Sequence, residues 1–296
     1  MASDHAIALE RLTKLYRGGR GVRDVDLQVG HGEVFGFIGP NGAGKSTTIR
    51  VLLGLLFPTS GAAWVLGADA TRADAALRAR IGYLPSEPRL YDGMTVGETL
   101  AYLGGFFRGD TGPRRRALAE ALDLDLSRRA EDLSIGNKKK VALVAALQHA
   151  PDVLILDEPT SGLDPLIQAR LFAALREERA RGATVFFSSH VLSEVERLCE
   201  RVAILKDGRI LEVARVEDLR ARQVKRVRLR GRAARTLALP GVREAQVDDG
   251  HASFVYGGEL RALLAALAED AVVDVTIEEP SLEEVVLSRY AEGGGG

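Results

Sequence analysis

Short apolar runs alternate with stretches of helical periodicity through the first two thirds of the chain. Nearly continuous apolar runs predict buried strands at EVFGFIG (residues 33–39), DVLILD (152–157) and ATVFFSSH (183–190). The first run is followed by KSTTIRVLLGLL and the second by PLIQARLFAALREERARG, and both segments have the spacing of helices. The run RVAILKDGRILEVA predicts a hairpin that turns at Asp207-Gly208. This order of elements predicts an α/β fold with a largely parallel sheet.

The pattern changes after about residue 215, where alternating segments replace the buried runs. Strands are predicted at VKRVRLRG, REAQVDD, HASFVYG and VVDVTIEE, and helices at VEDLRARQ, GELRALLAALAED and PSLEEVVLSRYAE. We therefore expect a first domain at residues 1–214, a small accessory α+β domain at 215–292, and a flexible glycine tail at 293–296. The basic strand has two interpretations, a nucleic-acid patch or a solvated face, and its alternation with Val227 and Leu229 favours the solvated face.

Composition narrows the class of protein. The chain has 296 residues and a net charge of −1, so no global basic field points to nucleic acid as a partner. The single cysteine, Cys199, excludes an internal disulfide and is expected to be a buried thiol. Residues 51–68 are uncharged and approach the length of a membrane span, but the turn sequence PTSG interrupts them. The opening MASDHAIALERL lacks the apolar core of a secretion signal, so we expect a soluble protein.

The segment GPNGAGKST fits the phosphate-loop pattern, in which glycine and four residues precede Gly-Lys-Ser/Thr. Its backbone N–H groups are expected to surround phosphate oxygens, and the following helix directs its positive end at them. Lys45 would reach the β- and γ-phosphates, and the Ser46 hydroxyl would bind Mg²⁺. The predicted nucleotide-binding residues are Gly39, Pro40, Asn41, Gly42, Ala43, Gly44, Lys45, Ser46 and Thr47.

The segment LILDEPTSGLD places two carboxylates at the end of a predicted buried strand. Ligands gather at the carboxyl ends of strands in open α/β sheets, so Asp157 is expected to hold Mg²⁺ there. Glu158 is next to it and is expected to activate a water molecule as general base, an effect worth roughly 10²–10⁴ in rate. Together with the phosphate loop, the pair predicts hydrolysis of a nucleotide.

The segment DLSIGNKKKVAL raises a question, because it loads positive charge onto the start of a predicted helix. The helix dipole disfavours each lysine at 138–140 by about 0.3–1 kcal/mol at an exposed site. Either the lysines are solvated at a tolerable cost or they face a polyanionic partner, and the sequence leaves both interpretations open.

These motifs together resemble the nucleotide-binding subunit of ATP-binding cassette (ABC) transporters over roughly residues 7–215. The resemblance implies a P-loop cassette with a helical signature subdomain that binds ATP and Mg²⁺. It implies that Tyr16 stacks on adenine, that SGLD at 161–164 contacts a second cassette, and that His190 contacts the γ-phosphate. LSIGN resembles the family's signature, usually Leu-Ser-Gly-Gly-Gln, in which Ser134 and Gly136 meet the ATP of the partner subunit.

The chain departs from the family pattern in two places. Ile135 and Asn137 replace a glycine and the glutamine of the signature. In YLPSEP, Ser86 stands where the family usually has a glutamine that contacts Mg²⁺ and the attacking water. Both departures are reminiscent of a subgroup of bacterial exporters, and the last domain resembles tails of bacterial ABC-2-type exporters, often for drugs or antibiotics.

The resemblance predicts an ATPase subunit that dimerises around two Mg-ATP molecules and drives a separate membrane permease. It would then act at the cytoplasmic face of a bacterial membrane. The segment RLYDGMTVGETLAYLGGFF is the expected docking surface, although the sequence does not say which of its aromatic side chains are exposed. Two alternatives stay open. One is a soluble cassette ATPase not tied to transport, and the other is a regulatory subunit that binds ATP without hydrolysing it.

Overall fold

The computed structural model describes residues 4–221 and 225–278, and the chain forms two compact units, Met1–Ala214 and Arg215–Gly296. The division lies where the hydrophobic pattern changes. The helix predicted at 280–292 and the glycine tail at 293–296 lie outside the described residues. Each unit is described by itself below.

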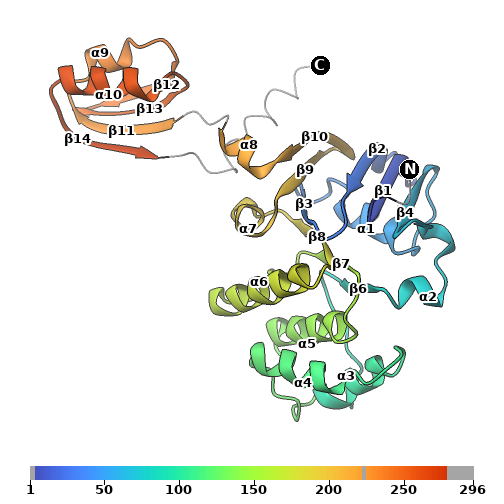
Figure 1. Cartoon of the computed structure of the whole chain (residues 1–296). Helices are drawn as coiled ribbons and strands as arrows, with labels where there is room; N and C mark the ends of the chain where they lie inside the picture. Colours follow the sequence, from blue (N-terminus) through green and yellow to red (C-terminus); the bar gives the residue numbers. More distant parts are fainter. Residues whose placement is uncertain (1–3, 222–224, 279–296) are drawn as a thin grey trace. The chain divides into compact units, whose positions relative to one another are not determined.

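A six-stranded sheet forms the centre of the first unit, with strand order β10-β9-β3-β8-β7-β6 (Figure 1). Its strands are β3 (Val34–Ile38), β6 (Ile81–Leu84), β7 (Val153–Asp157), β8 (Thr184–Ser189), β9 (Arg201–Lys206) and β10 (Arg209–Arg215). Strands β6, β7, β8, β3 and β9 are parallel, so their carboxyl ends meet at one edge. The predicted hairpin joins β9 to β10, and Asp207 and Gly208 have the positive φ angles, 47° and 78°, that a tight hairpin turn needs.

A second, antiparallel sheet of the first unit has the order β2-β1-β4-β5. It consists of β1 (Ile7–Leu15), β2 (Gly21–Val29), β4 (Ser60–Val65) and β5 (Ala68–Asp69), and is followed by the short helices η2 (Ala70–Arg72) and α2 (Ala75–Arg78). One continuous core joins both sheets and includes Ile7, Val65, Phe35, Phe37 and Phe186. The two sheets therefore fold as one unit.

Six longer helices complete the described part of the first unit. They are α1 (Lys45–Leu52), α3 (Val96–Gly104), α4 (Gly112–Ala121), α5 (Ile135–Leu147), α6 (Pro165–Ala180) and α7 (Leu192–Leu198). Helices α3, α4 and α5 contact one another and form a helical subdomain, drawn in green in Figure 1. The predicted α/β cassette with a helical signature subdomain is thus confirmed.

Two expectations from composition can be compared with this fold. None of the helices within residues 4–221 and 225–278 is long and apolar enough to cross a bilayer. In the uncharged segment at residues 51–68, α1 ends at Leu52 and β4 begins at Ser60, so the segment is interrupted as predicted. The helix ends before Leu56, where its predicted segment stops. Cys199 is buried just after α7, and burial raises the pKa of its thiol.

The second unit contains an antiparallel sheet with the order β12-β13-β11-β14. Its elements are α8 (Val216–Ala221), β11 (Lys225–Gly231), α9 (Ala234–Leu237), β12 (Val242–Asp248), β13 (His251–Tyr256), α10 (Leu260–Glu269) and β14 (Val272–Glu278). Val227 and Leu229 of β11 pack with Phe254 and Leu263 in a separate core, whereas Arg228 and Arg230, which alternate with them, are exposed. This alternation is that of the half-solvated strand predicted for the basic segment.

Candidate functional site

The loop between β3 and α1 is shaped to surround an anion. Gly42 and Gly44 have φ angles of 84° and 111°, a backbone region that other residues rarely adopt. No side chain caps the N-terminus of α1, and its first turn contains no acidic residue. Its N–H groups and the positive end of the helix dipole are therefore available to a phosphate group.

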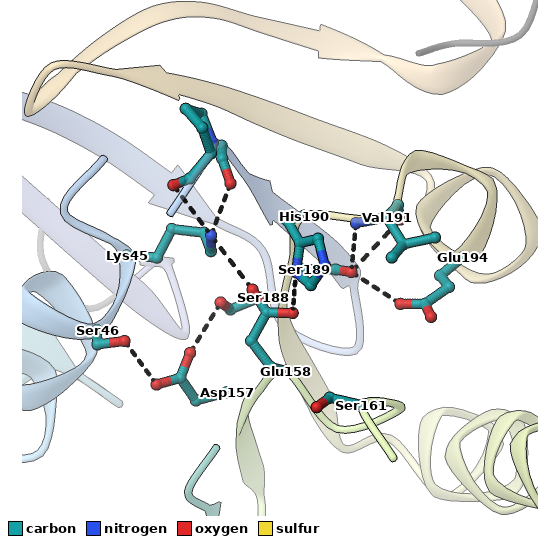
Figure 2. A network of polar contacts seen from close by, with 12 residues as sticks. Lys45, Ser46, Asp157, Glu158, Ser161, Ser188, Ser189, His190, Val191 and Glu194 are labelled. Atoms are coloured by element: carbon teal, nitrogen blue, oxygen red, sulfur yellow. Dashed lines mark hydrogen bonds and ion pairs between the residues drawn. The ribbon is translucent and has the colours of Figure 1, made fainter. Parts of the chain in front are cut away.

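Lys45, the first residue of α1, is only 6% exposed and lies against the same loop. Its ammonium group donates hydrogen bonds to the Gly39 carbonyl at 2.6 Å and the Pro40 carbonyl at 3.4 Å. It also forms an ion pair with Glu158 Oε1 at 3.2 Å (Figure 2). Lys45 thus joins the phosphate loop to the residue after β7.

Asp157 ends β7 at the carboxyl edge of the parallel sheet and is 2% exposed. Its two carboxylate oxygens accept hydrogen bonds from Ser46 at 2.8 Å and from Ser188 at 3.0 Å. A hydroxyl beside a carboxylate suits Mg²⁺, which binds one or two protein oxygens and completes its shell with water and phosphate. The described residues contain no group of three or more His, Cys, Asp and Glu side chains placed for a metal ion, so a cation here depends on those other ligands.

Glu158 directs its carboxylate at the same region from a strained backbone, with φ at 51°. His190 Nδ1 lies 2.6 Å from its Oε2, within hydrogen-bond distance, as Figure 2 shows. Its Oε1 is buried, and within the described part of the chain its polar partner is the Lys45 ammonium at 3.2 Å. A buried acceptor of this kind suits the binding and activation of a water molecule.

Four residues that the sequence analysis did not select hold these groups in place. Ser188 supports Asp157, and the neighbouring Ser189 donates a 2.7 Å hydrogen bond to the buried Glu194. The Val191 N–H donates to Ser189 Oγ at 2.9 Å, so the chain on both sides of His190 is fixed (Figure 2). The only indication of these supporting residues in the sequence was the pair of serines that precedes the histidine in FFSSH.

A cavity of about 400 Å³ gathers most of the predicted residues. Its lining consists of Tyr16, Arg20, Gly21, Pro40, Asn41, Gly42, Gly44, Lys45, Ser46, Thr47, Ser86 and Glu158. Arg20 was not predicted, because nothing in the local sequence distinguishes it from other surface arginines. Gly39, Ala43, Asp157 and His190 are not part of this lining, although Asp157 contacts Ser46 and His190 contacts Glu158. Ser134 and Gly136 lie at the start of the separate helix α5. The arrangement provides the groups that transfer of a phosphoryl group to water requires.

The N-terminus of α5 is a second position suited to an anion. Ser134 caps the helix by accepting a hydrogen bond from the Asn137 N–H at 3.3 Å, and no acidic residue lies in the first turn. Ile135 is 76% exposed at this end. Gly136 has a reason of its own to be glycine, since a Cβ would lie 2.8 Å from the Gly162 carbonyl oxygen.

Two of the three lysines at the start of α5, Lys139 and Lys140, are neither solvated nor directed at a polyanionic partner. Lys139 is 1% exposed and donates to the carbonyls of Glu158 at 2.5 Å and Ser161 at 3.0 Å. Lys140 is 9% exposed and donates to the Asp123 carbonyl at 3.2 Å. Both side chains bind main-chain carbonyls of this chain, while Lys138 is half-buried. Burial lowers the pKa of Lys139, and the Glu158 and Asp157 carboxylates oppose that change.

Comparisons with known proteins agree with this geometry. The family described as ABC transporter matches residues 22–161. The Nod factor export ATP-binding protein I of Rhizobium leguminosarum bv. viciae is 34% identical over 292 residues, which cover 95% of this chain and 94% of that protein. The probable multidrug ABC transporter ATP-binding protein YbhF of Escherichia coli (strain K12) is 37% identical over 224 residues. That match covers 73% of this chain but only 38% of the length of YbhF.

Solved structures are similar over the first unit. A dimeric structure of the ATP-binding cassette MJ0796, in a post-hydrolysis state bound to ADP and Pi, superposes with a TM-score of 0.64 and 26% identity. The match covers 71% of this chain and 98% of that one. The similarity therefore extends from sequence motifs to the arrangement of the elements that carry them.

Proposed function

The chain belongs to the ABC transporter family of ATP-binding subunits, and on that basis we propose that it hydrolyses ATP to drive an exporter. In this proposal two copies close head to tail around two Mg-ATP molecules and act on a separate membrane permease at the cytoplasmic face. The relative with 34% identity over nearly the whole chain is an export protein, which supports export as the direction of transport.

The observation that carries the proposal is the convergence of Lys45, Ser46 and Glu158 on one cavity, with Asp157 in contact with Ser46 and His190 in contact with Glu158. A subunit that only binds ATP has no need for a carboxylate beside the phosphate loop whose buried oxygen is paired with the same lysine that a phosphate group would bind. The geometry therefore favours hydrolysis over the regulatory alternative. The cavity wall also includes Tyr16, which supports the proposal that this ring stacks on adenine.

Each residue has a defined task in this proposal. Phosphate oxygens compete with Gly39 and Glu158 for the Lys45 ammonium, so ATP binding frees the Glu158 carboxylate. Ser46 and Asp157 would hold Mg²⁺, which when bound neutralises charge on the phosphates. Glu158 accepts a proton from water, and His190 keeps the carboxylate oriented.

Residues at the start of α5 support the head-to-tail dimer. An uncompensated helix N-terminus attracts a phosphate, yet Ser134 and Gly136 do not line this chain's own cavity. The exposed Ile135 beside them suits an interface better than open solvent. We propose that the anion is the γ-phosphate held by the second subunit.

Aromatic side chains of the expected docking segment support a membrane partner. Tyr91, Tyr102 and Phe106 are exposed, and the Tyr102 ring contacts the other two edge to face, with centroids 5.7 Å from Tyr91 and 5.2 Å from Phe106. Phe107 is excluded from this surface because it stacks on the partly buried His149 at 3.7 Å. A cluster of exposed aromatic rings typically marks a protein interface.

Replacement of Ser134 by arginine tests the dimer. We expect Ser134→Arg to reduce ATP turnover more than tenfold, because its side chain would fill the partner's γ-phosphate site. ATP binding to the monomer should change less than twofold, since Ser134 does not line the monomer's cavity. Turnover assays and titration calorimetry measure the two effects.

The matched control is Ser134→Asn, which retains an acceptor for the helix cap without adding a large side chain. It should keep most of the turnover and the thermal stability. A collapse of monomer affinity in Ser134→Arg, with its fold intact, would contradict the assignment of this segment to the partner's ATP.

Ser86 is expected to matter less than the residues around it. Serine is shorter than the usual glutamine and would act through a bridging water, which is enthalpically nearly as good as a direct hydrogen bond. We therefore expect Ser86→Gln and Ser86→Ala to change turnover less than about tenfold, or ~1.4 kcal/mol in the barrier. If Ser86→Ala alone silenced turnover of the isolated subunit, serine would be a primary catalytic ligand.

A further inference from the structure

Lys139 is a buried cation that the proposed chemistry does not use. It lies on α5, its side chain is shielded from solvent, and its ammonium donates to the main-chain carbonyls of Glu158 and Ser161. An ammonium group is strongly disfavoured in a protein interior unless it is paired and hydrogen-bonded. The two carbonyls therefore determine where this lysine sits, and the lysine in turn restrains the loop that carries them.

That loop holds Glu158 in its strained conformation. The Glu158 N–H donates to the Ser188 carbonyl at 3.0 Å, and its carbonyl accepts the Lys139 bond at 2.5 Å. Both peptide groups next to the positive φ angle are thus fixed, one by strand β8 and the other by α5. Strain of this kind persists only where the surroundings enforce it, so loss of either restraint would let the carboxylate turn away.

The first turn of α5 touches the same loop without involving a lysine. Gly136 lies so close to the Gly162 carbonyl that a Cβ would leave only 2.8 Å between them. The start of α5 and the loop at residues 158–162 therefore have two independent contacts. A displacement of one is transmitted to the other.

We infer that Lys139 is a positioning residue that fixes the Glu158 loop to helix α5. In the proposed dimer, on which this inference rests, the start of α5 contacts the partner's ATP while Glu158 serves the chain's own ATP. Lys139 then couples the position of Glu158, the general base for the chain's own ATP, to the start of α5, which contacts the partner's ATP. It touches neither nucleotide, so its loss should impair turnover and leave ATP affinity intact.

The chain provides a matched control on the same helix. Lys140 is also buried and also donates to a main-chain carbonyl, but its partner is Asp123 rather than the Glu158 loop. Lys140→Met therefore removes a buried lysine and one hydrogen bond without releasing Glu158. A general loss of stability should affect both variants, whereas a positioning role affects only Lys139→Met.

The experiment compares the full chain with Lys139→Met, Lys139→Arg and Lys140→Met, with kcat from ATP turnover and ATP affinity from calorimetry. We expect Lys139→Met to lower kcat at least tenfold with affinity within twofold of the original. Lys139→Arg, which can donate to both carbonyls, should recover most of that loss, and Lys140→Met should stay within threefold. Equal kcat values for Lys139→Met and Lys140→Met would overturn the inference.

Two further outcomes keep this test decisive. If circular dichroism shows that Lys139→Met does not fold, Lys139→Gln replaces it, because one amide can still bond one carbonyl. A threefold or larger fall in its kcat at unchanged affinity supports the inference, and an unchanged kcat refutes it. Absence of ATP turnover in the original chain would instead reject the proposed function itself.

Discussion

Glu158→Gln should bind Mg-ATP but reduce its turnover by more than about 10²-fold, because the amide cannot accept the proton of the attacking water. The substitution is nearly isosteric and keeps an oxygen beside His190. It also removes the negative charge that now pairs with the Lys45 ammonium at 3.2 Å. ATP affinity is therefore expected to stay equal or to rise. ATP should then persist in the closed dimer, and size-exclusion chromatography with and without Mg-ATP should show an ATP-dependent dimer.

The control for this prediction is Glu120→Gln, which neutralises an exposed carboxylate on α4 without altering the cavity. It should turn over ATP at the original rate and dimerise as weakly as the original chain. Undiminished turnover in Glu158→Gln would show that another group activates the water. The assignment of Glu158 as general base would then be wrong.

The parts of the fold that could be predicted are those fixed by local pattern. Strands β3, β7 and β8 are buried on both faces, so their sequences are largely apolar and leave little choice of structure. The β9–β10 turn was predictable because Asp-Gly readily adopts positive φ at both positions. The phosphate loop was predictable for a related reason, since its glycines satisfy backbone demands that other residues rarely meet.

The antiparallel sheet near the start of the chain was not predicted. Strand β1 would show regular alternation if it were straight, but its pairing with β2 shifts register between Leu9 and Leu12. Arg11 and Asp24 take φ angles of 44° and 48° at these irregularities. A β-bulge adds a residue to one strand and reverses the faces beyond it, so the period-two signal is lost.

The environment of the lysines on α5 could not be predicted for a different reason. Lys139 is 19 residues from Glu158 and 22 from Ser161, and the contacts exist only after β7 has paired within the sheet. A local pattern gives the charge and its position on the helix. It does not say whether a long side chain ends in solvent or folds back onto a carbonyl group. Tertiary structure therefore replaced both interpretations of Lys139 and Lys140.

Lys45→Ala should lower ATP affinity by at least about 10²-fold, or ~2.7 kcal/mol, because it removes the charged donor expected to reach the β- and γ-phosphates. The ammonium is already desolvated at 6% exposure, so its attraction for phosphate is screened less than that of a surface lysine. A ligand that binds only the folded state raises its melting temperature. Mg-ATP should thus raise the melting temperature of the original chain and leave that of Lys45→Ala unchanged.

Arg50→Ala is the matched comparison, because Arg50 lies on the same helix but is exposed and does not line the cavity. It should keep the full thermal shift with Mg-ATP. Lys45→Ala also deprives Glu158 of its cationic partner, so both variants are first melted without nucleotide to establish that they fold. With folding established, a full Mg-ATP shift in Lys45→Ala would mean that the backbone cradle binds the phosphates without the lysine. In that case the role of Lys45 would be confined to holding Gly39, Pro40 and Glu158 together in the nucleotide-free subunit.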